Sequence, residues 1–164
     1  MKIIYLAAGY AVIPGYDIVY NDYYVDRDLK ADMLQVDLSS YDILIASPPC
    51  NYYSKANYRR NFSDYALNTR HLLPCILDKF IKTGKPFIIE NVINKPLMFN
   101  ILSSLPFNIY YFEWGRHCYF TNIYFDFNVS LTEKLKIAHM SPIKRQGYGN
   151  VNQVFKRFLE VLYV

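Results

Sequence analysis

Cysteine is scarce in this sequence, and its three copies are widely spaced. Cys50, Cys75 and Cys118 form no C-x-x-C pair, so their spacing predicts neither a zinc site nor a disulfide framework. We therefore assign no metal ligands. We also expect the thiols to stay reduced, as they do in cytoplasmic proteins.

Long apolar runs are missing as well. The apolar residues that follow Lys2 soon meet Gly9, Pro14 and Asp17, which is unlike a signal peptide. No uninterrupted apolar stretch approaches the ~20 residues that a membrane-spanning helix needs, so we expect no membrane partner. Repeats, low-complexity tracts and clear linkers are also absent. Residues 1–164 are therefore predicted to form a single domain.

Charge is divided unevenly along the chain. Residues 1–50 contain three basic residues and seven aspartates, a net charge of −4. Residues 51–164 contain 15 basic and seven acidic residues, a net charge of +8. The division suggests two different ligands, with the basic part facing a polyanion. A mixed, solvated surface is the alternative explanation.

Short apolar runs alternate with helix-like stretches, which predicts a three-layer α/β domain. Because the early runs are continuously apolar, we expect strands buried on both faces of a mostly parallel sheet. The stretch between Gly9 and Asp17 is too short for the usual connection between parallel strands, so the first crossover helix is predicted to be short or missing. The expected strands are 2–8, 17–20, 33–36, 41–46, 86–90, 108–113 and 119–127, and the expected helices are 66–82, with a kink at Pro74, 101–105 and 151–164.

Several polar or turn residues directly follow these predicted strands. In a parallel sheet, ligands gather where the strands end, so such residues are expected to share one site. They are Gly9, Asp22, Asp37, Cys50 and Glu90.

Cys50 and Glu90 are the two residues of this set that could carry covalent chemistry. Pro48 and Pro49 stiffen the turn that presents Cys50, and Glu90 ends the next apolar strand. A lone cysteine is more often a buried structural residue, and a lone glutamate is more often a surface or cap residue. Together, at the ends of two strands, they favour a thiol nucleophile with a carboxyl partner.

Four motifs, in order, resemble those of the DNA cytosine-C5 methyltransferase family. Ser47-Pro48-Pro49-Cys50 resembles the catalytic Pro-Cys motif, and Glu90-Asn91-Val92 resembles the Glu-Asn-Val motif. Gly115-Arg116-His117 resembles the later arginine motif, and Gly149-Asn150-Val151 resembles the closing Gly-Asn-Val motif. The resemblance implies a Rossmann-like methyltransferase fold and the activity of a DNA (cytosine-5-)-methyltransferase that uses S-adenosylmethionine.

The resemblance covers residues 42–160, and residues 46–60 look like short phage-encoded members of the family. A phage protein of this kind would act in the host cytoplasm. Little room remains between Asn122 and Gln146 for a separate target-recognition domain. Sequence specificity would then be low, or it would come from a homodimer or from an accessory subunit.

The resemblance also implies roles for individual residues. Cys50 would add to C6 of cytosine, Glu90 would act at N3, and Arg116 would support Glu90 and contact the flipped nucleotide. Asn91 would order the Cys50 turn. The basic residues that follow Cys50 could contact DNA phosphates. They could equally belong to an ordinary solvated loop. The residues assigned to substrate or DNA are Ser54, Lys55, Arg59, Arg60, Asn91 and His117.

The methyl-donor site departs from the family pattern. Ala7 stands at the aromatic position of the family's Phe-x-Gly-x-Gly loop, and Ala11 stands at its second glycine. Asp22 and Asp37 are candidates for contacts to the ribose and the adenine, although both could equally be turn or cap residues. The residues assigned to the donor are Ala8, Gly9, Asp22, Asp37, Pro48 and Asn150.

Two alternatives to DNA methylation stay open at this point. A catalytically inactive DNA-binding module that keeps the fold would explain the altered glycine loop. It would not by itself explain the presence of Cys50, Glu90 and Arg116 together. The second alternative is the same chemistry on RNA.

Overall fold

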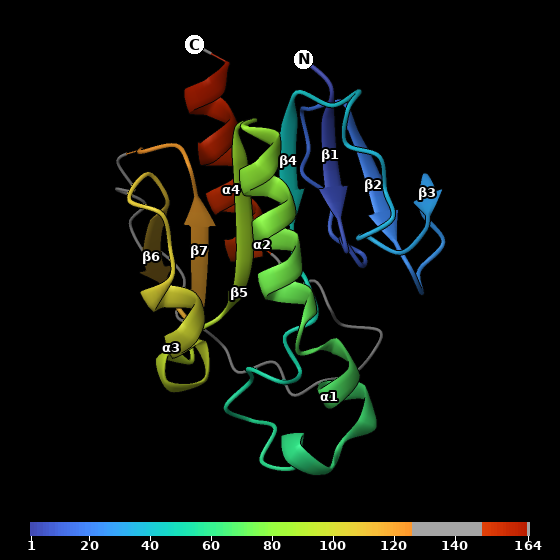
Figure 1. The fold of residues 1–164 in the computed structure, drawn as a ribbon. Helices are drawn as coiled ribbons and strands as arrows, with labels where there is room; N and C mark the ends of the chain where they lie inside the picture. Colours follow the sequence, from blue (N-terminus) through green and yellow to red (C-terminus); the bar gives the residue numbers. More distant parts are fainter. Residues whose placement is uncertain (126–148, 164) are drawn as a thin grey trace.

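The structure is a computed structural model, and it describes residues 1–125 and 149–163. Its centre is one mixed sheet of seven strands in the order β3-β2-β1-β4-β5-β7-β6, and helices cover the sheet (Figure 1). The chain is therefore an α/β protein, as the sequence predicted. The strands are β1 Ile3–Leu6, β2 Ile18–Asp22, β3 Leu29–Lys30, β4 Ile43–Ala46, β5 Phe87–Val92, β6 Tyr110–Trp114 and β7 His117–Thr121.

Most of the sheet is parallel. β3, β2, β1, β4 and β5 run in one direction, and β7 lies antiparallel between β5 and β6. The chain moves outward from β1 in one direction through β2 and β3, then returns to the other side of β1 as β4. The sheet therefore has its topological switch point between β1 and β4, where ligands of open α/β sheets bind.

Helices lie on both faces of the sheet. α2 lies over one face together with α3, and α4 lies over the opposite face (Figure 1). The short α1 lies beyond the carboxyl ends of β1 and β4, at the bottom of Figure 1. The helices are η1 Arg60–Phe62, α1 Asp64–Thr69, α2 Leu72–Thr83, α3 Lys95–Ser103 and α4 Gly149–Leu162.

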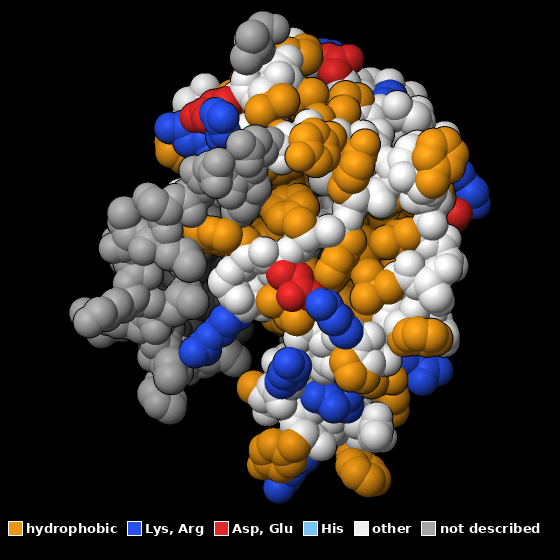
Figure 2. All heavy atoms as spheres, turned by 90° about the vertical axis from the view of Figure 1, so that its left-hand side faces the viewer, with side chains coloured by type: hydrophobic (Ala, Val, Ile, Leu, Met, Phe, Trp, Pro, Cys, Tyr) orange, Lys and Arg blue, Asp and Glu red, His pale blue; other side chains and the backbone are white. Residues whose placement is uncertain are grey.

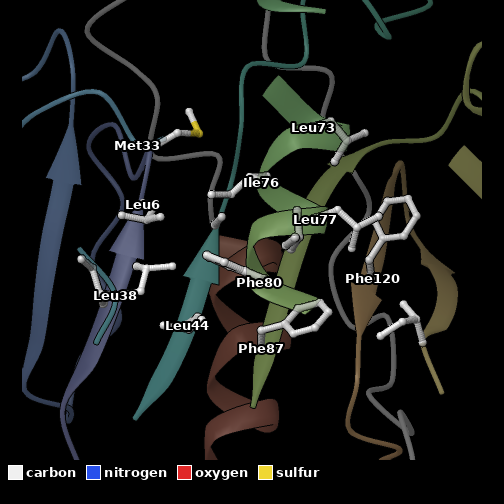
Figure 3. Packing of buried hydrophobic residues seen from close by; sticks show 14 of the residues in the cluster. Leu6, Met33, Leu38, Leu44, Leu73, Ile76, Leu77, Phe80, Phe87 and Phe120 are labelled. Carbon is white, nitrogen blue, oxygen red and sulfur yellow. The ribbon is translucent and has the colours of Figure 1, made fainter. Parts of the chain in front are cut away.

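Alternate side chains of the central strands enter two separate cores. Ile4 and Leu6 of β1 face the core under α2 and α3, whereas Ile3 and Tyr5 face the core under α4. Strands buried on both faces need continuous apolar sequence, which is what the early part of the chain provides. Figure 3 shows the first of these cores, between α2 and the sheet.

Aromatic packing holds α2 on the sheet. Phe80 of α2 is fully buried and lies against Phe87 of β5, with ring centroids 5.7 Å apart. Truncating a buried ring of this kind typically costs about 3–5 kcal/mol. Because Phe87 begins the strand that carries Glu90 and Asn91, this packing also fixes the strand that supports the candidate site.

The connection between β1 and β2 contains no helix, as the short spacing predicted. Its backbone groups are paired with side chains instead: Ile13 N–H donates to the Tyr20 hydroxyl at 2.9 Å, and the Arg27 guanidinium donates to the Ala11 carbonyl. Asn152 of α4 donates to the Val12 carbonyl at 2.8 Å. An irregular connection can be stable because these contacts satisfy groups that a helix would pair internally.

The third predicted strand is wrong. Residues 33–36 form a turn, and the strand beside β2 is the two-residue β3, Leu29–Lys30. The Asp32 side chain accepts the Leu34 N–H at 2.9 Å, and its carbonyl accepts the Gln35 N–H, so the backbone of this stretch is used locally. Met33 and Val36 are nevertheless buried in the core under α2, which explains the apolar pattern.

The helix predicted over residues 66–82 is two helices, α1 and α2. Pro74 lies in the first turn of α2, which begins at Leu72. A proline is well tolerated there because backbone N–H groups of the first turn have no partner within the helix. The proline therefore marks the start of a new helix rather than a kink in a long one.

Ala7 adopts a left-handed backbone conformation, with φ of 52°. This conformation costs an L-residue about 1–2 kcal/mol, and glycine adopts it without strain. We expect Ala7→Gly to raise the free energy of unfolding by about 0.5–1 kcal/mol in urea denaturation. Ala8→Gly is the control: Ala8 is buried and has no positive φ, so its substitution should destabilise. Equal effects of the two substitutions would contradict strain at Ala7.

Candidate active site

The turn after β4 presents Cys50 and is held from three sides. The Tyr5 and Ser47 hydroxyls form a hydrogen bond at 2.8 Å, and Ser47 N–H donates to the Leu6 carbonyl at 3.1 Å. Asn91 Nδ2 donates to the Pro48 carbonyl at 3.0 Å. β1, β4 and β5 thus fix the backbone that leads to the thiol.

Asn91 is fully buried in β5. Its side-chain Nδ2 donates to the Pro48 carbonyl, and its side-chain Oδ1 accepts the Val92 N–H at 3.0 Å. The contact to the Cys50 turn is the one that the Glu-Asn-Val resemblance implied. Asn91 therefore supports the turn, and burial leaves it no direct access to a nucleic acid.

Cys50 and Cys118 lie in contrasting environments. Cys50 is partly exposed, whereas Cys118 is buried in β7 and contacts the Val92 carbonyl. Burial, followed by the charge of Glu90, raises the pKa of the Cys118 thiol to about 12. Since the thiolate is the reactive form, Cys118 is inert at neutral pH.

This contrast predicts a thiol-labelling pattern. Iodoacetamide at pH 8 should modify the partly exposed Cys50 and the exposed Cys75 in the folded protein. Cys118 should react only after unfolding in guanidinium chloride, because it is both buried and protonated. Peptide mass spectrometry distinguishes the sites, and labelling of Cys118 in the folded protein would contradict this arrangement.

Glu90 lies in β5 with its side chain mostly buried, and its partner is His117. The Glu90 Oε1 and His117 Nδ1 atoms are 2.5 Å apart. The pairing follows from the sheet register: Glu90 lies opposite Tyr119 and Val92 lies opposite His117, which makes Glu90 and His117 diagonal neighbours on one face. The side chain that orients Glu90 is thus a histidine.

Arg116 lies beside this pair but makes a different contribution from the one implied. It occupies the turn between β6 and β7, its side chain is exposed, and its carbonyl accepts the Ile93 N–H at 3.2 Å. Among the described residues, no ion pair joins Arg116 to Glu90. The side chain that contacts Glu90 is instead His117, because the register of β7 against β5 makes His117 its diagonal neighbour.

A cavity of about 360 Å³ opens at the carboxyl ends of β1 and β2. It is lined by Ala7 after β1, by residues 21–24 at the end of β2, and by residues of α1 and the start of α2. Its size and mixed polar and aromatic lining are typical of small-molecule sites. The lining residues include Ala7, Asn21, Asp22, Tyr23, Tyr24, Asp32, Tyr65, Asn68 and His71.

Asp22 has a structural role at this cavity. Its carboxylate accepts the Gly9 N–H at 2.9 Å, the Tyr24 N–H at 2.8 Å and the Val25 N–H at 3.0 Å. Asn21 beside it is fully buried and donates to the Leu29 and Ala31 carbonyls. These two side chains fix the loops after β1, β2 and β3, which determines the shape of the cavity.

Asp32, rather than Asp37, is the second acid of the cavity. Asp37 is exposed, lies outside the cavity lining, and bonds to the backbone and the hydroxyl of Ser39. Those hydrogen bonds lower the pKa of Asp37, as expected for a turn residue. The assignment of Asp37 depended on a strand over 33–36, and the actual β3 places Asp32 at the sheet edge instead.

The other residues expected to bind the donor do not line the cavity: Ala8, Gly9 and Pro48 are absent from its lining, and the Asn150 side chain is not described. Ala8 is buried, its N–H donates to the Asn21 carbonyl at 2.9 Å, and Gly9 bonds to Asp22. Pro48 is buried in the Cys50 turn. Asn150 belongs to α4, but its side chain lies outside the described part of the structure.

The loop after Cys50 is extensively hydrogen-bonded. Ser54 N–H donates to the Cys50 carbonyl at 2.8 Å, and the Arg60 guanidinium donates to the Ser54 carbonyl at 2.6 Å. Arg60 is therefore half-buried and engaged within the loop, whereas Lys55 and Arg59 are exposed. Of the expected substrate residues, Lys55 and Arg59 remain available for phosphate contacts.

Tyr53 connects this loop to the rest of the site. It is buried, its hydroxyl donates to the Arg70 carbonyl at 2.8 Å, and its carbonyl accepts from Asn94 Nδ2 at 2.8 Å. Burial raises the pKa of Tyr53 to about 12, so the hydroxyl stays a donor. Sequence reasoning missed Tyr53, Asn94, Asn21 and Asp32, since nothing in their spacing distinguishes a supporting polar residue from an ordinary loop residue.

A search of protein-family models and of curated proteins finds no match to this chain. Within residues 1–125 and 149–163, no helix has the length and apolar character needed to span a membrane.

Proposed function

We propose that this protein transfers a methyl group to C5 of cytosine in DNA, using Cys50 as the nucleophile. The observation that carries the proposal is the contact between the turn after β4 and the neighbouring parallel strand β5. The Cys50 turn follows β4, Glu90 lies in β5, and Asn91 next to Glu90 bonds to the Pro48 carbonyl at 3.0 Å. A thiol and a carboxyl group are thus held at the same edge of the sheet as the cavity.

The strand order supports a Rossmann-like methyltransferase fold. The order β3-β2-β1-β4-β5 is that of a doubly wound sheet. β6 and β7 form an antiparallel hairpin in which β7 lies next to β5. This pairing brings His117 to Glu90. Ala7, which follows β1, lines the cavity, so the cavity reaches the β1 side of the switch point, where such a fold binds its small ligand.

The residues of the cavity fit S-adenosylmethionine as the donor. Its purine and ribose would lie against Tyr23 and Tyr24, near the carboxylates of Asp22 and Asp32. Asp32 Oδ1 accepts the Leu34 N–H, while Oδ2 makes no hydrogen bond within the described residues and would be available to an amino or hydroxyl group. When bound, S-adenosylmethionine supplies an electrophilic methyl group.

The protein's own groups would make cytosine reactive. C5 of cytosine is a poor nucleophile until a thiolate adds to C6, because addition places electron density on C5. Cys50 would form that C–S bond. After C5 is methylated, loss of the C5 proton to a base and return of the C–S electron pair to sulfur would release Cys50 as a thiolate.

Glu90 and His117 would stabilise the charge that the addition produces. Negative charge develops toward N3 of the ring, and a protonated carboxyl group can donate to that nitrogen. Glu90 shares a hydrogen bond with His117 Nδ1 through Oε1, so Oε2 is the oxygen available to the base. His117 would hold the carboxyl group in position through this hydrogen bond.

Donor binding offers a matched test. We expect Asp32→Ala to weaken S-adenosylmethionine binding about 10–100-fold, the value of one hydrogen bond to a charged group. Asp37→Ala should leave binding unchanged, because Asp37 lies outside the cavity. Isothermal titration calorimetry measures both variants, and a loss confined to Asp37→Ala would contradict this assignment of the cavity.

Transfer itself is tested with methyl-labelled S-adenosylmethionine and a mixed-sequence DNA. Label recovered as 5-methylcytosine after digestion is the expected result. Label on another base, or no label although the donor binds, would contradict the proposal.

An inactive nucleic-acid-binding module is the second candidate, and the β1–β2 connection favours it. That connection has no helix and contains the strained Ala7 at the cavity wall. This candidate predicts nucleic-acid binding without measurable donor binding.

A further inference from the structure

The loop between β4 and α1 combines positive charge with exposed aromatic rings. Residues 51–62, hereafter the basic loop, contain Lys55, Arg59 and Arg60 and no acidic residue. Tyr58 is 81% exposed and Phe62 is 88% exposed. Large apolar rings held in water beside cations are typical of surfaces that receive another molecule.

The basic loop is internally braced, so these rings are displayed on a defined backbone. Asn57 Nδ2 donates to the Asn51 carbonyl at 2.9 Å, and Phe62 N–H donates to the Arg59 carbonyl at 2.9 Å. The Arg60 guanidinium bonds to the Ser54 carbonyl, and Tyr53 fastens the loop to Arg70. A partner would therefore bind without first ordering the backbone, which lowers the entropic cost of binding.

Positive charge continues beyond the basic loop. Lys95 of α3 lies 3.1 Å from Glu113 of β6, and the pKa of Glu113 is lowered, first by the Tyr111 hydrogen bond and then by Lys95 and Lys55. Arg116 is exposed nearby, in the turn between β6 and β7. Figure 2 shows this side of the molecule, with Lys and Arg side chains gathered on its lower half around one acidic group.

We propose that the basic loop binds single-stranded nucleic acid, with bases stacked on Tyr58 and Phe62 and phosphates paired with Lys55 and Arg59. This inference rests on the proposed function, because it names the form of substrate presented to Cys50. The rings distinguish single strands from duplexes: in a duplex the faces of each base are covered by its neighbours, whereas an unpaired strand offers every face to an aromatic side chain.

The arrangement of the rings and cations fits such a strand. The Arg59 guanidinium lies over the Tyr58 ring, 5.6 Å from its centroid, so a phosphate held by Arg59 would place its base beside the same ring. The basic loop begins immediately after Cys50, the proposed nucleophile. The Ser54 N–H donates a hydrogen bond to the Cys50 carbonyl, which keeps the start of the loop close to Cys50. A base carried by the strand would reach Cys50 without being extracted from a duplex, which avoids the cost of unstacking and unpairing.

The test is fluorescence anisotropy with one labelled oligonucleotide in three forms. The probes are a single-stranded DNA 12-mer containing one cytosine, the same DNA sequence closed in a hairpin duplex, and the RNA 12-mer. We expect single strands to bind at least tenfold more tightly than the duplex. Preference between the DNA and RNA strands identifies which single strand is used, and either preference supports the proposal.

Aromatic variants test the stacking directly. Phe62→Ala and Tyr58→Ala should each weaken single-strand binding about tenfold, the effect of one base stack, and Phe62→Trp should restore it. Phe107→Ala is the matched control, because Phe107 is 101% exposed on the turn between α3 and β6. Equal affinity for duplex and single strand, or unchanged binding in the Tyr58→Ala/Phe62→Ala double variant, would overturn the proposal.

The same DNA sequences, with 5-fluorocytosine in place of the cytosine and with S-adenosylmethionine present, separate this inference from the proposed function. Tight, ring-dependent single-strand binding without a Cys50 adduct on 5-fluorocytosine would reject methyl transfer and retain the binding surface. An adduct that forms equally on the duplex and in Phe62→Ala would reject the binding surface and retain the chemistry.

Discussion

Replacing Cys50 with alanine is expected to abolish methyl transfer to cytosine, lowering the rate by about 10³-fold or more, as removal of a covalent nucleophile does. Without the thiol, C6 receives no electron pair, and C5 stays unreactive. The turn should persist in the variant, because Asn91 bonds to the Pro48 carbonyl and Ser54 bonds to the Cys50 carbonyl. Neither contact uses the thiol.

Cys75→Ala is the control for this prediction. Cys75 is exposed on α2 and should be dispensable for transfer. Donor binding measured by calorimetry should match the unsubstituted protein in both variants, since the cavity lining includes neither cysteine. A Cys50→Ala protein that binds the donor and still methylates would show that the reaction uses another group.

The second large effect is expected at Glu90. Glu90→Gln keeps the shape of the side chain but cannot deliver a carboxyl proton to the ring, so we expect the transfer rate to fall about 10²–10⁴-fold. Glutamine is preferred to alanine for this test, because Glu90 is mostly buried and contacts His117. An empty position would also leave His117 without its partner.

Substitutions of His117 and Arg116 should have different effects on the reaction. His117→Ala should lower kcat, because the His117 Nδ1 atom contacts Glu90 Oε1 and would hold the carboxyl group in position. Arg116→Ala should mainly weaken nucleic-acid binding, because Arg116 is exposed and forms no ion pair with Glu90. A larger loss of kcat in Arg116→Ala than in His117→Ala would favour the role that the motif resemblance assigned to Arg116.

The central strands of the fold could be predicted from the sequence because their chemistry is uniform. β1, β4 and β5 are buried on both faces, so each is a continuous apolar run that ends at a polar residue or a turn. Because Cys50 and Glu90 follow the apolar runs of two such strands, the sequence predicts that they share one site. The missing helix between β1 and β2 could also be predicted, since its connection is short.

The outer strand could not be predicted in the same way. β3 has two residues, lies in a polar stretch and, among the strands that the structure describes, pairs only with β2, so it has no apolar pattern of its own. The apolar residues nearby, Met33 and Val36, are buried by packing under α2 rather than by forming a strand. The same stretch bears on the proposed donor site, because the sequence favours Asp37, whereas the residue that lines the cavity is Asp32.

The sheet register decides which side chain contacts Glu90. The sequence places Arg116 and His117 side by side, and alternation alone does not say which of them faces Glu90. The antiparallel pairing of β5 with β7 decides it, because Val92 lies opposite His117. Buried supports such as Tyr53 and Asn94 are similarly defined by contacts between distant segments.

A covalent trap tests the role of Cys50 most directly. In 5-fluorocytosine DNA, the fluorine at C5 cannot be removed as a proton is, so the elimination that frees the thiol is blocked after methylation. With S-adenosylmethionine present, we predict a protein–DNA adduct that survives denaturing electrophoresis, with peptide mapping placing the DNA on Cys50, and no adduct in Cys50→Ala. DNA that binds but forms no adduct, or an adduct that persists in Cys50→Ala, would contradict Cys50 as the nucleophile.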